Sequence, residues 1–273
     1  MAIIPISNLP QSAALSGAEL FPIVQGGTTK YVEVSSFVGG VNNTASGNSS
    51  TIAGGQKNTA SSGCSVVAGG SQNTASGYRS FIGGGSYNRA SGYVATVGGG
   101  NHNTASGGNS VVAGGGAGYY GQNVASGYYS GILGGESNTA SGDNSVVAGG
   151  SCNTALSAHS FIGGGYCNTA SGYCSTIAGG SYNTASGICS VVGGGRNNCA
   201  SGNRSGILGG CNNAASHNKS FIIGSDLASN AACTTFVNNL SAQGSLYAGN
   251  GFTGDIAGCT SITITNGIIT AAS

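Results

Sequence analysis

The sequence contains little charge, little proline and no tryptophan. Charged residues make up 5% of its 273 positions, against about 25% in a typical soluble domain. The formal net charge of +1 argues against charge-driven disorder and against the basic surface that nucleic-acid binding requires. No apolar run reaches the roughly 18 residues of a membrane-spanning helix, so we expect no membrane insertion.

Glycine, in contrast, occupies 54 positions, which is far above its usual share of about 7%. Such a composition disfavours long helices, because each glycine costs about 1 kcal/mol in a helix interior relative to alanine. The glycines do not recur at every third position, so the chain is not collagen-like. The first residues, Met1–Ser7, lack the basic and apolar regions of a secretory signal, which predicts synthesis in a host cytoplasm without export by that route.

The nine cysteines form no Cys-x-x-Cys pair, which argues against a zinc ribbon or a thioredoxin-like site. We interpret them as small residues on packed or exposed surfaces. The histidines His102, His159 and His217 fall at different repeat positions, and no two carboxylates are placed as a glycosidase pair. We therefore expect no catalytic residues, no metal site, no cofactor and no enzymatic activity.

An asparagine recurs every 15 residues, except where five extra residues separate Asn103 from Asn123. With this asparagine as position 0, the unit reads Asn-Thr-Ala-Ser-Gly-x-x-Ser-x-Ile/Val-x-Gly-Gly-x-x. Alanine at +2, isoleucine or valine at +9 and glycine at +11 occur in all twelve copies, and serine at +7 in all but Ala95. Self-similarity at a fixed short period is typical of a solenoid.

A 15-residue unit is long enough for one coil of two short strands and two tight turns. The segment Ser-x-Ile/Val-x predicts one strand and Thr-Ala-Ser the other. Glycines at +4, +11 and +12, together with the asparagine at 0, are residues that accept positive φ at corners. We expect an all-β parallel roll of twelve coils, roughly 58 Å long at about 4.8 Å per coil, with half-coils at both ends.

Alternate strand residues face opposite sides, so the residues at +2 and +9 are predicted to meet inside the coil. Representatives of this core are Ala45, Ile52, Ala75, Ile82, Ala140, Val147, Ala170 and Ile177. Positions +8 and +10 face the other way and are also apolar, usually one large and one small. The large residues of this proposed inter-chain face are Phe81, Val111, Leu133, Phe161, Leu208 and Phe221. A strand that is apolar on both sides predicts self-association with cyclic symmetry; the alternative is a monomer with one apolar outer face.

The repeat resembles the head repeats of trimeric autotransporter adhesins, the YadA-like heads, over residues 35–240. That resemblance implies a left-handed parallel β-roll in which three chains lie side by side as a homotrimer. The sequence departs from those adhesins in having neither a signal peptide nor a C-terminal outer-membrane anchor. Secretion and display by the adhesin route are therefore not expected.

The segment from Ile6 to Phe37, which includes Ile-Ser-Asn-Leu-Pro and Leu-Ser-Gly-Ala-Glu-Leu-Phe-Pro-Ile-Val-Gln, is similar to the N-terminal segments of phage fibre and virion structural proteins. The resemblance implies that residues 1–34 attach the chain to other virion proteins. From the residues alone, 20–24 and 30–34 are predicted as two strands around a Gly26–Gly27 turn. Residues 241–273 leave the repeat, and their Asn266–Gly267 hairpin signal predicts a β cap or a docking tip.

Two sets of outward residues are candidates for surface contact. Tyrosines cluster at +5 and +6 and in the insertion, where they fit a glycan-binding surface or rim packing between chains: Tyr78, Tyr93, Tyr119, Tyr120, Tyr128, Tyr129 and Tyr173. Threonine at +1 in eight copies would form a rank of hydroxyls, as in ice-binding solenoids, or would simply suit an outer strand.

Together these features predict a structural virion fibre or decoration protein of a phage or another virus, acting as a rigid homotrimeric spacer. Its expected location is the virion, and a host-surface glycan or protein is an expected partner. The alternative is a cellular surface adhesin or an extracellular filament subunit.

Overall fold

The computed structural model describes residues 20–25, 28–33, 37–38, 40–117 and 121–238. These residues form strands and turns, and no helix occurs among them. Strands β1 (Leu20–Gln25) and β2 (Thr28–Glu33) pair antiparallel, with Gln25 opposite Thr28. The second strand thus begins two residues earlier than the sequence predicts. The C-terminal hairpin predicted at Asn266–Gly267 lies outside the described residues.

The repeat region forms a parallel β-solenoid in which each coil contributes one strand to each of two sheets. The 12-stranded sheet consists of β4 (Thr44–Ala45), β6 (Thr59–Ala60), β8 (Thr74–Ala75), β10 (Arg89–Ala90), β12 (Thr104–Ala105), β14 (Val124–Ala125), β16 (Thr139–Ala140), β18 (Thr154–Ala155), β20 (Thr169–Ala170), β22 (Thr184–Ala185), β24 (Cys199–Ala200) and β26 (Ala214–Ala215). The 14-stranded sheet consists of β3 (Phe37–Val38), β5 (Thr51–Ile52), β7 (Val66–Val67), β9 (Phe81–Ile82), β11 (Thr96–Val97), β13 (Val111–Val112), β15 (Gly131–Ile132), β17 (Val146–Val147), β19 (Phe161–Ile162), β21 (Thr176–Ile177), β23 (Val191–Val192), β25 (Gly206–Ile207), β27 (Phe221–Ile223) and β28 (Thr235–Val237).

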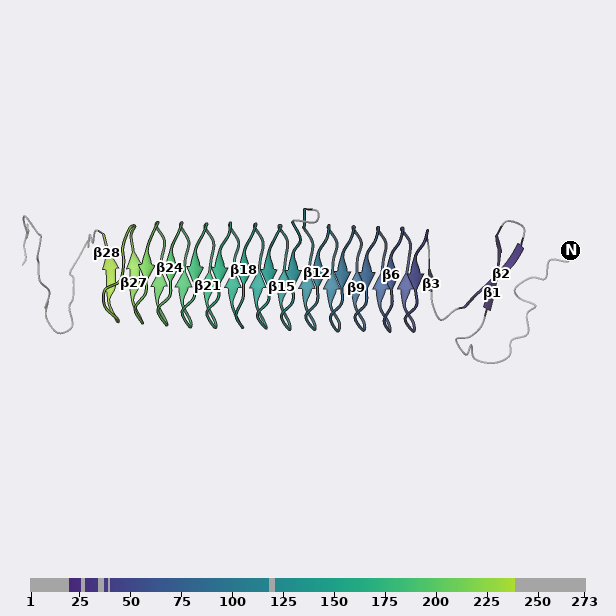
Figure 1. Ribbon diagram of the computed structural model, residues 1–273, viewed down its shortest axis with the longest axis horizontal. Helices are drawn as coiled ribbons and strands as arrows, with labels where there is room; N and C mark the ends of the chain where they lie inside the picture. The colour runs from purple at the N-terminus through teal and green to yellow at the C-terminus, as the bar shows by residue number, and fades with distance from the viewer. Residues whose placement is uncertain (1–19, 26–27, 34–36, 39, 118–120, 239–273) are drawn as a thin grey trace, which may run out of the picture. The chain divides into compact units, whose positions relative to one another are not determined.

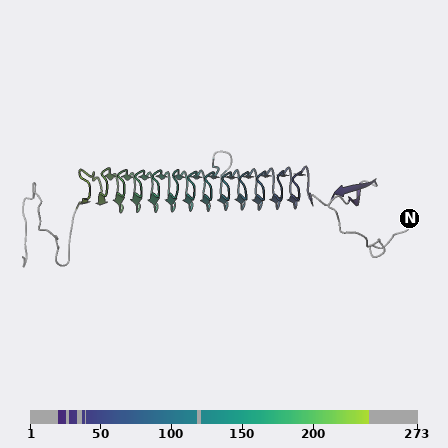
Figure 2. The ribbon, with the colours of Figure 1, turned by 90° about the horizontal axis from the view of Figure 1, so that it is seen from below.

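The coils stack in a single row with equivalent residues in register, as Figures 1 and 2 show from two directions. Ile52 pairs with Val67 in one sheet, and Ala60 pairs with Ala75 in the other. The extra strands β3 and β28 pair at the two ends of the 14-stranded sheet. The parallel solenoid and its 15-residue spacing are thus as the repeat predicts.

The core is a thin double column of small and branched side chains. From Ile52 onward, every alanine at +2 and every isoleucine or valine at +9 is at most 1% exposed. Among the residues singled out for this core, Ile52, Ala75, Ile82, Ala140, Val147, Ala170 and Ile177 are buried, and Ala45, in the first coil, is partly buried. Alanine opposite a branched residue keeps the two sheets close together.

The backbone of the corners differs from the prediction made for the asparagine and for the glycine at +4. Neither of these takes a positive φ. Positive φ occurs instead at the +12 glycines and at the non-glycine positions +6 and +14, as in Arg79 (φ 55°) and Tyr87 (φ 56°). At +11 it occurs only in Gly84, Gly164 and Gly224. Each of these strained corners is tied to the preceding coil, for example by the Arg79 N–H that donates to the Gly63 oxygen at 2.9 Å. A regular hydrogen bond thus offsets the cost of a left-handed residue.

The two consecutive glycines at +11 and +12 have different roles. Gly150, at +12, has a φ of 85°, and a Cβ there would collide with the carbonyl oxygen of Gly165 in the next coil. A Cβ on Gly149, at +11, would meet no atom within 4 Å. Only the second glycine is therefore required by coil stacking.

The repeated asparagine forms a buried ladder inside the solenoid. Asn168 is fully buried, and its Nδ2 donates to the carbonyl oxygens of Gly164 and Gly180 at 3.1 and 2.9 Å. Its Oδ1 accepts the backbone N–H of Asn183, the equivalent residue of the next coil, at 3.0 Å. The same side chain thus closes a corner within its own coil and joins that coil to the next.

The five-residue insertion after Asn103 leaves the stacking register intact. Strand β12 still pairs with β14 through Ala105 and Ala125, and β13 pairs with β15. Within the insertion, the Ala117 N–H donates to the Gly121 oxygen at 3.2 Å. The extra residues are therefore absorbed at one corner.

Candidate functional site

The outer face of the 14-stranded sheet carries exposed apolar side chains. The proposed inter-chain residues project there from positions +8 and +10, and Leu133 and Leu208 are the most exposed, at 61% and 60%. Phe81, Val111, Phe161 and Phe221 are between 38% and 41% exposed. Within the single chain these residues leave an apolar strip along the solenoid that no described segment covers.

The tyrosines at +5 and +6 form short aromatic clusters along one corner of the coils. Tyr78 and Tyr93 stack in neighbouring coils with ring centroids 5.6 Å apart and an interplanar angle of 17°. The Arg79 guanidinium lies 5.1 Å from the Tyr78 ring centroid, a cation–π contact. All three side chains are exposed. The regular stacking of coils is what brings residues 15 positions apart into contact.

The remaining predicted tyrosines pair differently. Tyr128 and Tyr129 are neighbours in sequence and meet edge to face at 4.3 Å, and Tyr173 meets His159 of the preceding coil at 5.5 Å. Tyr119 and Tyr120 lie outside the described residues. The described tyrosines of this corner therefore form three separate clusters, two or three coils apart, rather than one continuous row.

The opposite corner, at +13 and +14, holds aromatic pairs that the sequence analysis did not single out. Tyr87 stacks on His102 at 4.6 Å, and Tyr166 meets Tyr182 edge to face at 5.3 Å. The hydrogen bond with Tyr182, followed by the interaction with Cys167, raises the pKa of Tyr166 to about 12. A separation of 15 or 16 residues at equivalent positions was the signal that could have revealed these pairs.

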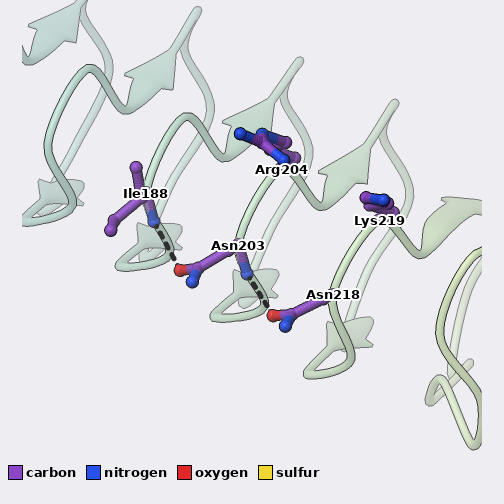
Figure 3. Close-up of a pocket in the computed structure, with 5 residues that line it drawn as sticks. All are labelled: Ile188, Asn203, Arg204, Asn218 and Lys219. Carbon is purple, nitrogen blue, oxygen red and sulfur yellow. Dashed lines mark hydrogen bonds between the residues drawn. The ribbon is translucent and has the colours of Figure 1, made fainter.

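A shallow pocket of about 200 Å³ lies at the +5/+6 corner near the C-terminal end of the solenoid, lined by Ile188, Asn203, Arg204, Asn218 and Lys219. Figure 3 shows Arg204 and Lys219 at equivalent places in neighbouring coils. The Oδ1 atoms of Asn203 and Asn218 accept the N–H groups of Ile188 and Asn203 at 3.0 and 2.9 Å. No carboxylate lines this pocket, so its charge is positive.

The threonines at +1 lie on the outer face of the 12-stranded sheet. The longest unbroken rank runs through Thr139, Thr154, Thr169 and Thr184, which pair in register. Arg89, Val124, Cys199 and Ala214 interrupt the column elsewhere. The outward threonines of the rank are partly exposed, so their hydroxyls face solvent in a regular array.

The eight described cysteines are free thiols, and all are exposed or partly exposed. Cys152 and Cys167 occupy +14 in neighbouring coils, and Cys174 and Cys189 occupy +6 in neighbouring coils. Burial, and then the neighbouring Cys152, raises the pKa of Cys167. A raised pKa keeps this thiol protonated and weakly nucleophilic near neutral pH.

Within the described ranges, no three His, Cys, Asp or Glu side chains converge as a metal site. In the same ranges, no helix has the length and hydropathy needed to cross a bilayer. Neither a known family model nor a curated protein matches this chain. The candidate sites are therefore defined by geometry alone: an apolar strip, an aromatic corner and a cationic pocket.

Proposed function

We propose that this chain is a structural fibre or decoration protein of a phage or another virus, and that it works as a homotrimeric spacer. The observation that carries the proposal is the uncovered apolar strip on the 14-stranded sheet. A chain with 5% charged residues has few charges with which to shield such a strip. Packing three copies around an axis parallel to the stack buries all three strips at once.

The size of the strip sets the contact area of the proposed assembly. Twelve coils at about 4.8 Å give a length of roughly 58 Å, and the three residues from +8 to +10 give a width of about 10 Å. Each chain therefore offers about 600 Å², so a trimer would bury about 1,800 Å² in all, or about 600 Å² at each of its three contacts, below the roughly 1,000 Å² of a stable pairwise interface. The left-handed winding implied by the adhesin resemblance belongs to the same proposal.

Native mass measurement tests the assembly. A homotrimer of 26.1 kDa chains has a mass of about 78 kDa. Detection of a monomer in solution would contradict the proposal. Leu133→Asp with Leu208→Asp should dissociate the trimer, because each places a charge in the apolar contact. Thr154→Asp with Thr169→Asp is the matched control, since these side chains lie on the opposite sheet.

The virion assignment rests on the resemblance of residues 6–37 to phage fibre proteins, and residues 1–34 are the proposed attachment segment. Its test is mass spectrometry of purified particles of the virus whose genome encodes the chain. Recovery of the protein from particles supports the assignment. Recovery only from the surface fraction of uninfected cells would instead support the adhesin alternative.

A second candidate function is ice binding, favoured by the in-register rank from Thr139 to Thr184. Its hydroxyl-bearing side chains repeat at the coil spacing of about 4.8 Å on a flat sheet that stays exposed in the proposed trimer. Thermal hysteresis of the purified protein supports this function, and its absence at millimolar concentration removes it.

A further inference from the structure

Arg204 and Lys219 place two positive charges side by side on a chain that has only seven basic residues. Both occupy +6, with φ of 57° and 58°. Their backbone N–H groups donate to the oxygens of Ile188 and Asn203 at 2.7 and 2.9 Å. These bonds fix the two corners at the coil spacing of about 4.8 Å. Adjacent like charges on paired elements repel each other, so the free protein bears a cost that a bound anion would remove.

No nearby described carboxylate balances this charge. Asp143 lies at the same corner, four coils before Asn203, which is roughly 19 Å along the stack at about 4.8 Å per coil. Its Oδ1 already accepts the Tyr128 N–H at 2.9 Å. Asp226 lies at the opposite corner, where it accepts a hydrogen bond from the Asn212 Nδ2 at 2.8 Å. The cation pair therefore faces solvent without a counterion among the described residues.

The pocket between these side chains matches a single small anionic group. Its volume of about 200 Å³ corresponds to roughly six or seven water molecules at about 30 Å³ each, and is below the roughly 300–1,000 Å³ of sites that enclose a whole small molecule. The Oδ1 atoms of Asn203 and Asn218 are used by the backbone, which leaves their Nδ2 groups as donors. Two cations and two amide donors would converge on one group, while the rest of its carrier extends into solvent.

We propose that this corner, formed by Arg204, Lys219, Asn203 and Asn218, binds an acidic group of a surface saccharide: a carboxylate, a sulfate ester or a phosphate. Guanidinium and ammonium groups recognise all three through charge-assisted hydrogen bonds. Ile188, exposed at the edge of the pocket, offers an apolar contact to a sugar ring. The assignment of a saccharide as the molecule that carries the acidic group rests on the proposed attachment function. The anion site itself does not depend on that function.

The test is surface plasmon resonance with the purified full-length protein on immobilised oligosaccharides. Separate arms carry a uronic-acid hexasaccharide, a sulfated hexasaccharide, a phosphorylated oligomannose and a neutral glucose hexasaccharide. Binding to at least one acidic arm, without binding to the neutral arm, and a weakening of at least tenfold between 50 and 300 mM salt are expected. No binding to any acidic arm overturns the proposal, and the strongest arm identifies the group.

The diagnostic variant is Arg204→Asn with Lys219→Asn, because asparagine tolerates a positive φ and already occupies +6 at Asn109 and Asn144. We expect it to weaken binding at least tenfold. The matched control, Lys57→Asn with Arg196→Asn, removes two charges from the opposite corner, where asparagine already occurs at Asn101 and Asn197, and should change affinity less than twofold. Equal losses in both variants would show non-specific attraction and overturn the site. Virion mass spectrometry tests the proposed function independently of the binding assay. A negative result in one experiment therefore does not affect the interpretation of the other.

Discussion

Replacing Asn168 by alanine tests whether the buried asparagine ladder holds neighbouring coils together. The substitution removes the Oδ1 that accepts the Asn183 N–H at 3.0 Å and the Nδ2 that donates to Gly164 and Gly180. The Gly180 oxygen keeps a second partner, the Tyr166 N–H at 2.9 Å. Two backbone groups therefore lose their partners: the buried Asn183 N–H and the partly exposed Gly164 carbonyl.

The orphaned buried Asn183 N–H costs about 1–3 kcal/mol and the partly exposed Gly164 carbonyl adds less, so the surrounding coils are destabilised by about 1–4 kcal/mol. The effect should be local, because each coil of a solenoid contacts only its neighbours. Thr169→Ala, at the next position in the same coil, is the matched control. Its side chain faces outward, and its loss should cost less than about 1 kcal/mol.

Hydrogen exchange followed by mass spectrometry measures the opening of these coils directly. At about 1.4 kcal/mol per tenfold change, a cost of about 2 kcal/mol, near the middle of this range, predicts that the Asn183 amide exchanges about 30 times faster in Asn168→Ala. Urea unfolding followed by circular dichroism should shift in the same direction. An acceleration no larger than that of Thr169→Ala would refute the structural role of the ladder.

Two further substitutions test the corners. Gly150→Ala should destabilise the solenoid by more than about 2 kcal/mol, because left-handed φ alone costs alanine about 1–2 kcal/mol and the added Cβ collides with the next coil; Gly149→Ala, which has room, should be near neutral in the same urea titration. Tyr182→Phe should lower the pKa of Tyr166 from about 12 toward 10, because it removes the hydrogen bond that contributes most to the shift, and ultraviolet titration of phenolate formation measures it. With the partner present, any stabilisation from the Tyr166 hydroxyl persists below pH 10 and is lost as the pH rises through about 12; an unchanged Tyr166 titration in the variant would contradict this assignment.

The solenoid could be predicted from sequence because the residues that stacking requires recur once in every coil. Alanine at +2 and a branched residue at +9 fill an interior too thin for larger side chains. The register follows from equal spacing, and the insertion between Asn103 and Asn123 leaves it unchanged. In such a repeat, residues 15 positions apart lie at equivalent places in neighbouring coils, so the spacing in sequence determines the spacing in the structure.

The conformation of the corners could not be predicted from residue preferences. Asparagine often marks a left-handed turn, yet here it is buried in a ladder, and residues such as Arg79 and Tyr87 take the positive φ instead. Asparagine is buried rather than placed at a left-handed corner because its carboxamide, inside the solenoid, forms hydrogen bonds with three backbone groups. A residue at an outward corner has to meet only the backbone conformation, so other residue types can occupy it. The pocket at Arg204 and Lys219 was missed for a related reason: its residues lie 15 positions apart and follow no known motif.

The scarcity of charge follows from the same geometry and indicates where recognition can evolve. Of the nine charged residues between 40 and 238, eight lie at +5, +6, +13 or +14, and Arg89 at +1 is the exception. Charge in the interior or on the apolar strip would cost stability, whereas the corners and the outward positions +1 and +3 reach solvent. Corner side chains can change without disturbing the core or the ladder. A binding site on this fold is therefore expected at a corner, built from one or two residues in each of several neighbouring coils, which is the arrangement found at Arg204 and Lys219.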